Sequence, residues 1–339
     1  MNGRKIRVLV VDDSLLFREV ISRGIESDPS IEVVAKAADP FEARDKILEF
    51  KPDVMTCDVE MPKMNGIEFI RRLLPQYSLP VIVISTVSEA VLDAVNVGAV
   101  DFVTKPDIQS PKNVEKFIID VIGKVKIAAN AKILRGNSVD AVSTTNVGKI
   151  YTDRLIAIGA STGGTEAIFN LLKSLPENMP GILIVQHIPP VFSRMFAQRL
   201  DNLTKLSVKE AQTGDYLEPG KVLIAPGDHH MKIKKLGEKI RVETFQGDKV
   251  NGHCPSVDVL FESVAKEAGT SSIGIILTGM GYDGARGLLA MKRKGSRTIG
   301  QDEQSSVVYG MPKAAYEIGA VEKQTSLSNI PQTLLAMLK

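Results

Sequence analysis

The chain has 339 residues, a net charge of +2 and no long run of basic residues, so nothing in its charge points to nucleic-acid binding. It has no run of about 18 apolar residues, and its first residues lack a signal-peptide layout, so we expect neither membrane insertion nor secretion. Two cysteines are too few for a disulfide framework, which favours a cytoplasmic location, and the length favours two domains.

The first 125 residues alternate between short apolar runs and segments whose apolar residues recur at helical spacing. The apolar runs predict buried strands at residues 6–11, 31–35, 54–57, 81–84 and 101–103. The segments that follow predict helices at residues 15–25, 41–50, 66–74, 89–97 and 114–125, with Ser14 as the cap of the first. This alternation predicts an α/β fold with a doubly wound parallel sheet.

Polar residues follow the predicted strands: Asp12, Asp13, Asp58, Ser85 and Lys105. The carboxyl ends of parallel strands share one edge of a sheet, where functional residues gather. Three carboxylates at that edge would repel one another, and a divalent cation such as Mg²⁺ would relieve the repulsion. The alternative is that these acids only cap helices. That reading accounts for Asp13 or Ser14, but not for Asp58 and Lys105.

Residues 1–125 resemble a response-regulator receiver domain. The motifs that carry the resemblance are Asp12-Asp13, Asp58, Met61-Pro62-x-Met64-Asn65-Gly66, Ser85-Thr86 and Lys105-Pro106. The resemblance implies a flavodoxin-like sheet and phosphorylation of Asp58 by a histidine kinase. It implies an Mg²⁺ site formed by Asp12, Asp13, Asp58 and the backbone carbonyl of Glu60. It also implies that Ser85 and Lys105 respond to the phosphoryl group. Phe102 stands where this family often has a rotating aromatic, and it is equally well interpreted as a core residue.

Residues 126–150 lose the periodic pattern and are predicted to be an inter-domain linker, and residues 151–339 are predicted to be a second α/β domain. Strands are predicted at residues 155–158, 182–185, 221–225, 273–277 and 297–301, and a hairpin at 231–234 and 240–242. Helices are predicted at residues 166–175, 192–203, 256–268 and 312–318. We therefore expect a second doubly wound, mostly parallel, Rossmann-like sheet with a β-hairpin.

Ser161 lies in a G-x-S-x-G pattern between a predicted strand and a predicted helix. Small neighbours permit a sharp turn that exposes the hydroxyl, and the N–H groups at the start of the helix could stabilise negative charge. A serine nucleophile needs a base and an orienting acid. His187 and Asp283 each follow a predicted strand, and this position favours His187 as the base over the other three histidines, which are His229, His230 and His253. Asp215 and Asp228 are rival acids, although both have the character of turn residues.

Three alternative interpretations compete with that of a hydrolase. The glycine-rich turn could have no chemical role, or it could bind the phosphates of a nucleotide, but no Walker lysine follows its glycines. Receiver domains often precede DNA-binding domains, so a DNA-binding output domain is the third alternative. The second half of the chain, however, has neither a helix-turn-helix pattern nor a basic stripe. The order Ser, His, Asp also differs from that of α/β-hydrolases.

Residues 154–320 resemble the catalytic domain of chemotaxis-specific protein-glutamate methylesterases. The resemblance rests on residues 158–164, Gln186-His187, 225–231, 255–258, 277–284 and 310–312. It implies a triad of Ser161, His187 and Asp283, with oxyanion N–H groups near Thr162 and Met280 and no cofactor for hydrolysis. The implied substrates are glutamate methyl esters and glutamines on the cytoplasmic helices of methyl-accepting chemoreceptors. The implied phosphodonor is a chemotaxis histidine kinase. Cys254 departs from the pattern, because the family usually has arginine there.

Overall fold

The computed structural model describes residues 4–62, 64–86, 91, 93–94, 97–107, 109–131 and 152–339. The chain forms two compact units, one on each side of residues 132–151. Most of the predicted linker therefore lies outside the described residues. None of the helices in the described parts of the chain combines the length and apolar character needed to cross a bilayer.

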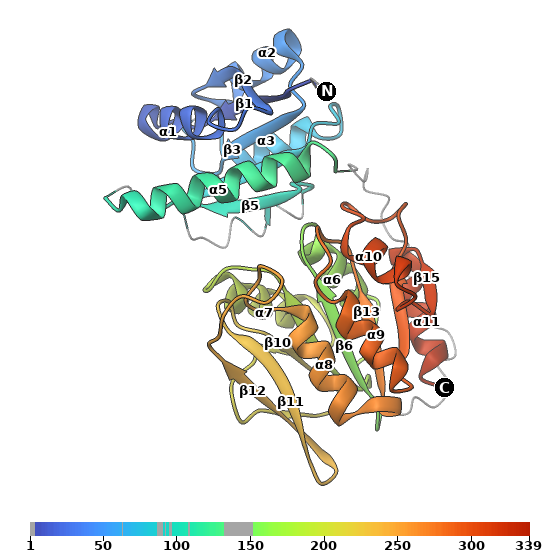
Figure 1. Ribbon diagram of the computed structural model, residues 1–339. Coiled ribbons are helices and arrows are strands. Elements are labelled where there is room, and N and C mark those ends of the chain that lie inside the picture. The colour runs from blue at the N-terminus through green and yellow to red at the C-terminus, as the bar shows by residue number, and fades with distance from the viewer. Residues whose placement is uncertain are drawn as a thin grey trace. The chain divides into compact units, whose positions relative to one another are not determined.

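The first unit is a five-stranded parallel sheet with the order β2-β1-β3-β4-β5, which is the flavodoxin-like order (Figure 1). Its strands are β1 (Ile6–Val11), β2 (Ile31–Ala37), β3 (Val54–Asp58), β4 (Val81–Ser85) and β5 (Asp101–Thr104). Every residue of β3 and β4 is buried. These are the inner strands of a sheet covered on both faces, which explains their unbroken apolar character.

The helices of the first unit that the structure describes in full are α1 (Leu15–Ile25), α2 (Pro40–Phe50), α3 (Gly66–Leu73) and α5 (Pro111–Ala128). Ser14 caps α1 as predicted, because its side chain accepts a hydrogen bond from the Phe17 N–H. Helix α5 begins earlier than predicted, since Pro111 is well suited to a first helical turn, and it extends into the range predicted as linker. The helix predicted at residues 89–97 lies largely outside the described residues.

The second unit contains a seven-stranded parallel sheet with the order β15-β14-β13-β6-β7-β10-β8 (Figure 1). Its strands are β6 (Leu155–Ala160), β7 (Gly181–Gln186), β8 (Ser207–Glu210), β10 (Lys221–Ile224), β13 (Ser272–Ile276), β14 (Arg297–Gln301) and β15 (Lys323–Thr325). On one side of β6 the sheet continues through β7, β10 and β8. The chain then returns to the other side of β6, where β13, β14 and β15 follow. This reversal makes a topological switch point at β6, which is where ligands bind in open α/β sheets.

The helices of this unit are α6 (Gly164–Lys173), α7 (Phe192–Leu203), α8 (Val257–Glu267), α9 (Ala285–Arg293), α10 (Met311–Glu317) and α11 (Ile330–Met337). Phe261 of α8 and Leu288 of α9 are fully buried, together with Leu183 of β7, in the same core. Both α8 and α9 start at the carboxyl edge of the sheet, so their first N–H groups lie beside the ends of the strands.

The predicted hairpin is present as β11 (His230–Leu236) and β12 (Lys239–Phe245), which pair antiparallel. Gly237 forms the turn with a φ of 62°, a conformation that favours glycine. The hairpin does not extend the parallel sheet. It joins β9 (Tyr216–Leu217) in a separate three-stranded antiparallel sheet, because β12 pairs with β9 along its other edge.

Candidate active site and phosphoacceptor site

Ser161 lies in the turn between β6 and α6, as the sequence predicts, and it is half-buried. Its N–H donates to the Thr278 carbonyl at 3.0 Å, which ties this turn to the one that follows β13. Gly163 has a φ of 75°, so a residue with a side chain would be strained there. A Cβ atom at Gly279 would lie 2.7 Å from the Ser161 Cβ atom. The two turns therefore lie so close together that a side chain at position 279 would clash with Ser161.

His187 directly follows β7, beside the end of β6. Its N–H donates to the Ala160 carbonyl at 3.1 Å, and the Gln186 side chain donates to the Ser161 carbonyl at 2.9 Å. The His187 Nε2 atom lies 2.9 Å from the Asp283 Oδ2 atom, and the two side chains are only 7% and 1% exposed. The buried Nδ1 atom has no hydrogen-bond partner among the described residues. Nor do the described residues include a hydrogen bond between the Ser161 hydroxyl and His187.

Asp283 is held between Gly281 and Gly284, whose φ angles are 87° and 90°. Its carboxylate receives five polar contacts: His187 Nε2 at 2.9 Å, Asn251 Nδ2 at 2.8 Å, Ser256 Oγ at 2.8 Å, Val257 N at 2.7 Å and Asp258 N at 3.3 Å. Burial alone would raise the pKa of Asp283. The hydrogen bonds and the charge of His187 outweigh it, so this pKa lies well below the usual value. Asp283 is therefore an anion at neutral pH.

Helix α8 supplies two of these contacts from its first turn, where unpaired N–H groups and the helix dipole favour an anion. Asn251 also donates to Asp258 Oδ2 at 2.7 Å, so its amide group bridges two buried carboxylates. Sequence reasoning singled out neither Asn251 nor Ser256 as functional. The only sequence signal was the motif at residues 255–258, which contains Ser256 and the first two residues of α8 but not Asn251.

The rival residues have structural roles. Asp215 pairs with Lys209 and accepts the N–H of Gln212 within its own turn, as expected for a turn residue. Asp228 has a φ of 58°, which also fits a turn. His230 accepts from the Ser256 N–H through Nδ1 and lies 2.9 Å from the Asp248 carbonyl through Nε2. His253 is different, because its ring stacks on His187 with the centroids 3.7 Å apart and the planes 11° apart.

Thr162 and Met280, the predicted sources of oxyanion N–H groups, flank Ser161 on two turns. Thr162 directly follows Ser161 and is buried, and its carbonyl accepts a hydrogen bond from Thr278 Oγ1 at 3.0 Å. Met280 directly follows Gly279, and its side chain is 51% exposed. The backbone of both residues is therefore close to the serine, and their part in stabilising an oxyanion stays a prediction.

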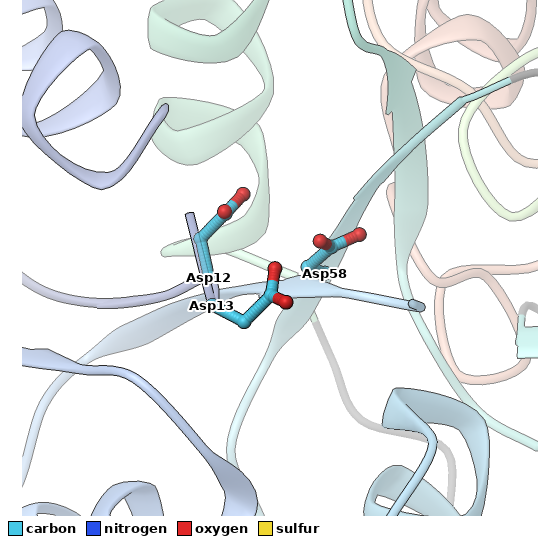
Figure 2. Close-up of side chains that lie close together, drawn as sticks. All are labelled: Asp12, Asp13 and Asp58. Atoms are coloured by element: carbon cyan, nitrogen blue, oxygen red, sulfur yellow. The ribbon is translucent and has the colours of Figure 1, made fainter. Parts of the chain in front are cut away.

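The first unit brings Asp12, Asp13 and Asp58 together at the ends of β1 and β3 (Figure 2). One carboxylate oxygen from each lies within 4.8 Å of the others. Lys105 Nζ lies 2.6 Å from Asp58 Oδ2 and 2.9 Å from Asp12 Oδ2. The structure therefore assembles the acids and the lysine that the sequence placed at this edge.

Burial raises the pKa of both Asp12 and Asp58, in spite of Lys105. Burial would lower the pKa of Lys105, but the two acids outweigh it and raise that pKa instead. One lysine thus leaves the cluster with excess negative charge. Hard oxygen ligands with uncompensated charge fit Mg²⁺, which binds through one or two carboxylates and retains water.

The other predicted receiver residues surround this cluster. Ser85 is fully buried, and its hydroxyl has no hydrogen-bond partner among the described residues. The Glu60 N–H donates to Asp58 Oδ1 at 3.3 Å, and the Glu60 carboxylate accepts from Thr86 at 3.4 Å. Phe102 is 4% exposed, with Lys124 Nζ 5.3 Å from its ring centre. Phe102 is thus a core residue in this structure.

Comparisons with known proteins match both units. A family model described as CheB methylesterase matches residues 156–334, and one described as response regulator receiver domain matches residues 8–114. A protein-glutamate methylesterase/protein-glutamine glutaminase 2 from Syntrophomonas wolfei is 56% identical over 338 residues, covering 100% of this chain and 99% of the relative.

A protein-glutamate methylesterase/protein-glutamine glutaminase from Escherichia coli is 46% identical, covering 98% of this chain and 97% of the relative. Among solved structures, the CheB methylesterase catalytic domain of Thermotoga maritima is 37% identical with a TM-score of 0.53. That match covers 54% of this chain and 98% of the solved chain.

Proposed function

This chain belongs to the CheB methylesterase family, and from that premise we propose that Ser161, His187 and Asp283 are its catalytic triad. The protein is a protein-glutamate methylesterase and protein-glutamine glutaminase with a receiver domain. The observation that supports this triad best is the His187–Asp283 contact of 2.9 Å at the strand ends beside Ser161. The alternative of a nucleotide-binding or DNA-binding output domain has no support, since the methylesterase match spans most of the second unit.

In the proposed reaction, the Ser161 hydroxyl attacks the ester carbonyl of a glutamate side chain. His187 takes the hydroxyl proton through Nδ1, because Nε2 is occupied by Asp283. The N–H groups of Thr162 and Met280 stabilise the oxyanion of the tetrahedral intermediate. His187 then returns the proton to the leaving oxygen, and methanol departs from the acyl-enzyme. Water activated by His187 hydrolyses the acyl-enzyme and restores Ser161.

The same steps deamidate a glutamine side chain, because its amide passes through an equivalent tetrahedral intermediate and releases ammonia in place of methanol. Asp283 stays ionised throughout, as its low pKa requires, and stabilises the His187 imidazolium. Hydrolysis by this route uses side chains and backbone N–H groups alone, and we propose that it needs no cofactor.

We propose that the substrates are the cytoplasmic helices of methyl-accepting chemoreceptors and that the enzyme acts in the cytoplasm. The receiver would occupy residues 1–125, the linker 126–150 and the catalytic domain 151–339. Asp58 would accept a phosphoryl group from a chemotaxis histidine kinase. Asp12, Asp13, Asp58 and the Glu60 carbonyl would hold Mg²⁺, which neutralises charge on the phosphoryl oxygens when bound. Lys105 and Ser85 would then contact those oxygens.

We further propose that the unphosphorylated receiver inhibits the catalytic domain and that phosphorylation relieves this inhibition. The experiment that tests the function is methanol release from methylated receptor membranes, with and without a small-molecule phosphodonor. We expect release that depends on Ser161 and rises on phosphorylation. Release that is independent of Ser161 would contradict the assignment.

A further inference from the structure

Residues 250–253 form a tight turn that supports itself. Two backbone hydrogen bonds close it, from the Val250 N–H to the His253 carbonyl and from the His253 N–H to the Val250 carbonyl, both at 3.0 Å. The central residues, Asn251 and Gly252, have φ angles of 53° and 86°. Asparagine and glycine are the residues that tolerate two successive positive φ angles, as a two-residue hairpin turn requires. The turn is therefore a defined structure from which side chains can project in fixed directions.

This turn contacts both members of the His187–Asp283 pair. Asn251 Nδ2 donates to Asp283 Oδ1 at 2.8 Å, and the His253 ring lies parallel to the His187 ring at 3.7 Å. His187 follows β7 and Asp283 lies in the turn after β13, so the two residues belong to separate segments of the chain. One turn of four residues thus links the base and the acid through two separate side chains.

The His187 ring needs such a link. Asp283 fixes one nitrogen of the ring, whereas Nδ1 has no partner among the described residues. A ring held by one hydrogen bond can still rotate about the line from its Cβ atom to that bond, which would change the direction in which Nδ1 points. A flat group packed 3.7 Å from one face prevents this rotation without occupying Nδ1.

We propose that His253 is a positioning residue, whose stacked ring holds the plane of His187 so that Nδ1 faces the Ser161 hydroxyl. The inference rests on the function proposed for Ser161, His187 and Asp283. His253 contacts His187 through its ring face, and no hydrogen bond in the described part of the chain joins its ring nitrogens to Asp283 or Ser161. His253 therefore acts through His187 and touches no reacting atom.

The charge of His253 suits this role. Burial, and then the neighbouring His187, lower the pKa of His253 to about 4, so its ring is neutral at neutral pH. Asp283 favours the charged form and Lys249 opposes it, and these are the other groups whose charges act on the ring. When His187 takes the serine proton, the resulting cation faces a neutral aromatic surface, which is a favourable arrangement. A charged His253 would repel that cation.

The test compares His253→Phe, His253→Ala and His253→Gln in the full-length chain, phosphorylated with a small-molecule phosphodonor. Initial rates of methanol release from methylated receptor membranes give kcat and KM across pH 6–9. Phenylalanine keeps a flat ring, whereas alanine and glutamine remove it. We expect His253→Phe to stay within about threefold of wild type, with an unchanged pH profile. We expect the other two to lower kcat on the order of 10–100-fold with little change in KM, as for a misplaced catalytic group.

Three controls separate the possible outcomes. His229→Ala removes a histidine whose ring lies 3.2 Å from the Gly227 carbonyl within its own turn, and it should leave kcat within twofold. The circular dichroism spectrum and the urea midpoint check that the second unit of each variant, which contains residue 253, is folded. Ser161→Ala tests the underlying function: if that variant turns over normally, the proposed triad is wrong. If only Ser161→Ala is inactive and His253→Ala is fully active, the positioning role alone is wrong.

Two further results would overturn the inference. One is a His253→Phe variant as slow as His253→Ala, which would show that the flat ring is not what matters. The other is a His253→Phe variant that loses one limb of the pH profile, which would make His253 a proton-transfer group.

Discussion

The Asp283 Oδ2 atom lies 2.9 Å from the His187 Nε2 atom, and the same carboxylate caps the first turn of α8. The acid is therefore held by the first turn of α8 as well as by its contact with His187. Ser256 Oγ adds a hydrogen bond at 2.8 Å from the residue that precedes α8. This arrangement leaves Asp283 ionised and rigid, as an orienting group for a general base must be.

Replacing Ser161 by alanine removes the proposed nucleophile. We expect the rate of methanol release to fall by about 10⁶ if the triad acts as a unit, because the histidine and aspartate then have no group to activate. The assay is release from methylated receptor membranes by the phosphorylated chain. Ser207→Ala, at an exposed position on the edge strand β8, is the matched control and should not change the rate. Near-normal turnover by Ser161→Ala would contradict the triad.

Asp283→Asn should be milder than Ser161→Ala, since catalysis by the serine and the oxyanion N–H groups survives loss of the orienting acid. We expect kcat to fall on the order of 10⁴. Asp258→Asn makes the same chemical change in a buried carboxylate that accepts from Asn251 and the Gly287 N–H but does not contact His187. Its effect on kcat should be much smaller. Equal losses in the two variants would mean that Asp283 acts only by stabilising the fold.

Asp58→Asn should abolish phosphorylation by acetyl phosphate, because the amide cannot attack phosphorus. Removing Mg²⁺ with a chelator should have the same effect on the wild-type chain. Neither change should alter ester hydrolysis by the unphosphorylated protein. Asp53→Asn, which affects an acid paired with Arg4 away from the cluster, serves as the control. Incorporation of labelled phosphate measures the outcome, and labelling of Asp58→Asn equal to wild type would place the phosphoryl group elsewhere.

A chain that begins near residue 148 should hydrolyse methyl esters faster than the unphosphorylated whole chain, because it lacks the inhibitory receiver. Phosphorylated full-length protein should approach the rate of that shorter chain. The comparison uses initial rates at equal enzyme concentration. A shorter chain no faster than the unphosphorylated whole would exclude inhibition. A phosphorylated whole chain much faster than the shorter one would indicate direct activation or recruitment of substrate by the receiver.

His253 should make stability depend on pH in a defined window. Its folded-state pKa of about 4 lies below the unfolded value of about 6.5, so the unfolded state binds more protons between these values. This titration therefore leaves the free energy of unfolding unchanged above pH 6.5 and lowers it as the pH falls toward 4, by at most about 3.4 kcal/mol. Asp283 has a lowered pKa, so its contribution is present above its unfolded value and is lost only at lower pH.

The measurement for this last prediction is the difference in urea midpoint between wild type and His253→Phe as a function of pH. The phenylalanine variant should gain relative stability from pH 6.5 down to 4. A constant difference over that range would contradict the buried neutral imidazole. Titration of the imidazole resonances by NMR gives an independent value.

Local pattern was enough to predict much of this protein. The strand at residues 6–11, the helix at 15–25 and the helix at 192–203 have the predicted ends, because apolar periodicity and capping residues act over a few neighbouring positions. The same reasoning placed Ser161 and His187 after strands, and the carboxyl ends of parallel strands share one edge. Sequence alone thus identified which residues could meet.

Only the tertiary structure decided how they meet. The edge strands β8 and β15 are short and partly polar, and the pairing of β12 with β9 depends on a distant partner, so local pattern predicted neither the edges nor the separate sheet. His253 lies 66 residues from His187 and 30 from Asp283 along the chain, yet its turn contacts both. Such contacts follow from the order of strands in the sheet and the start of α8. No local spacing encodes that order, because it is set by long-range packing.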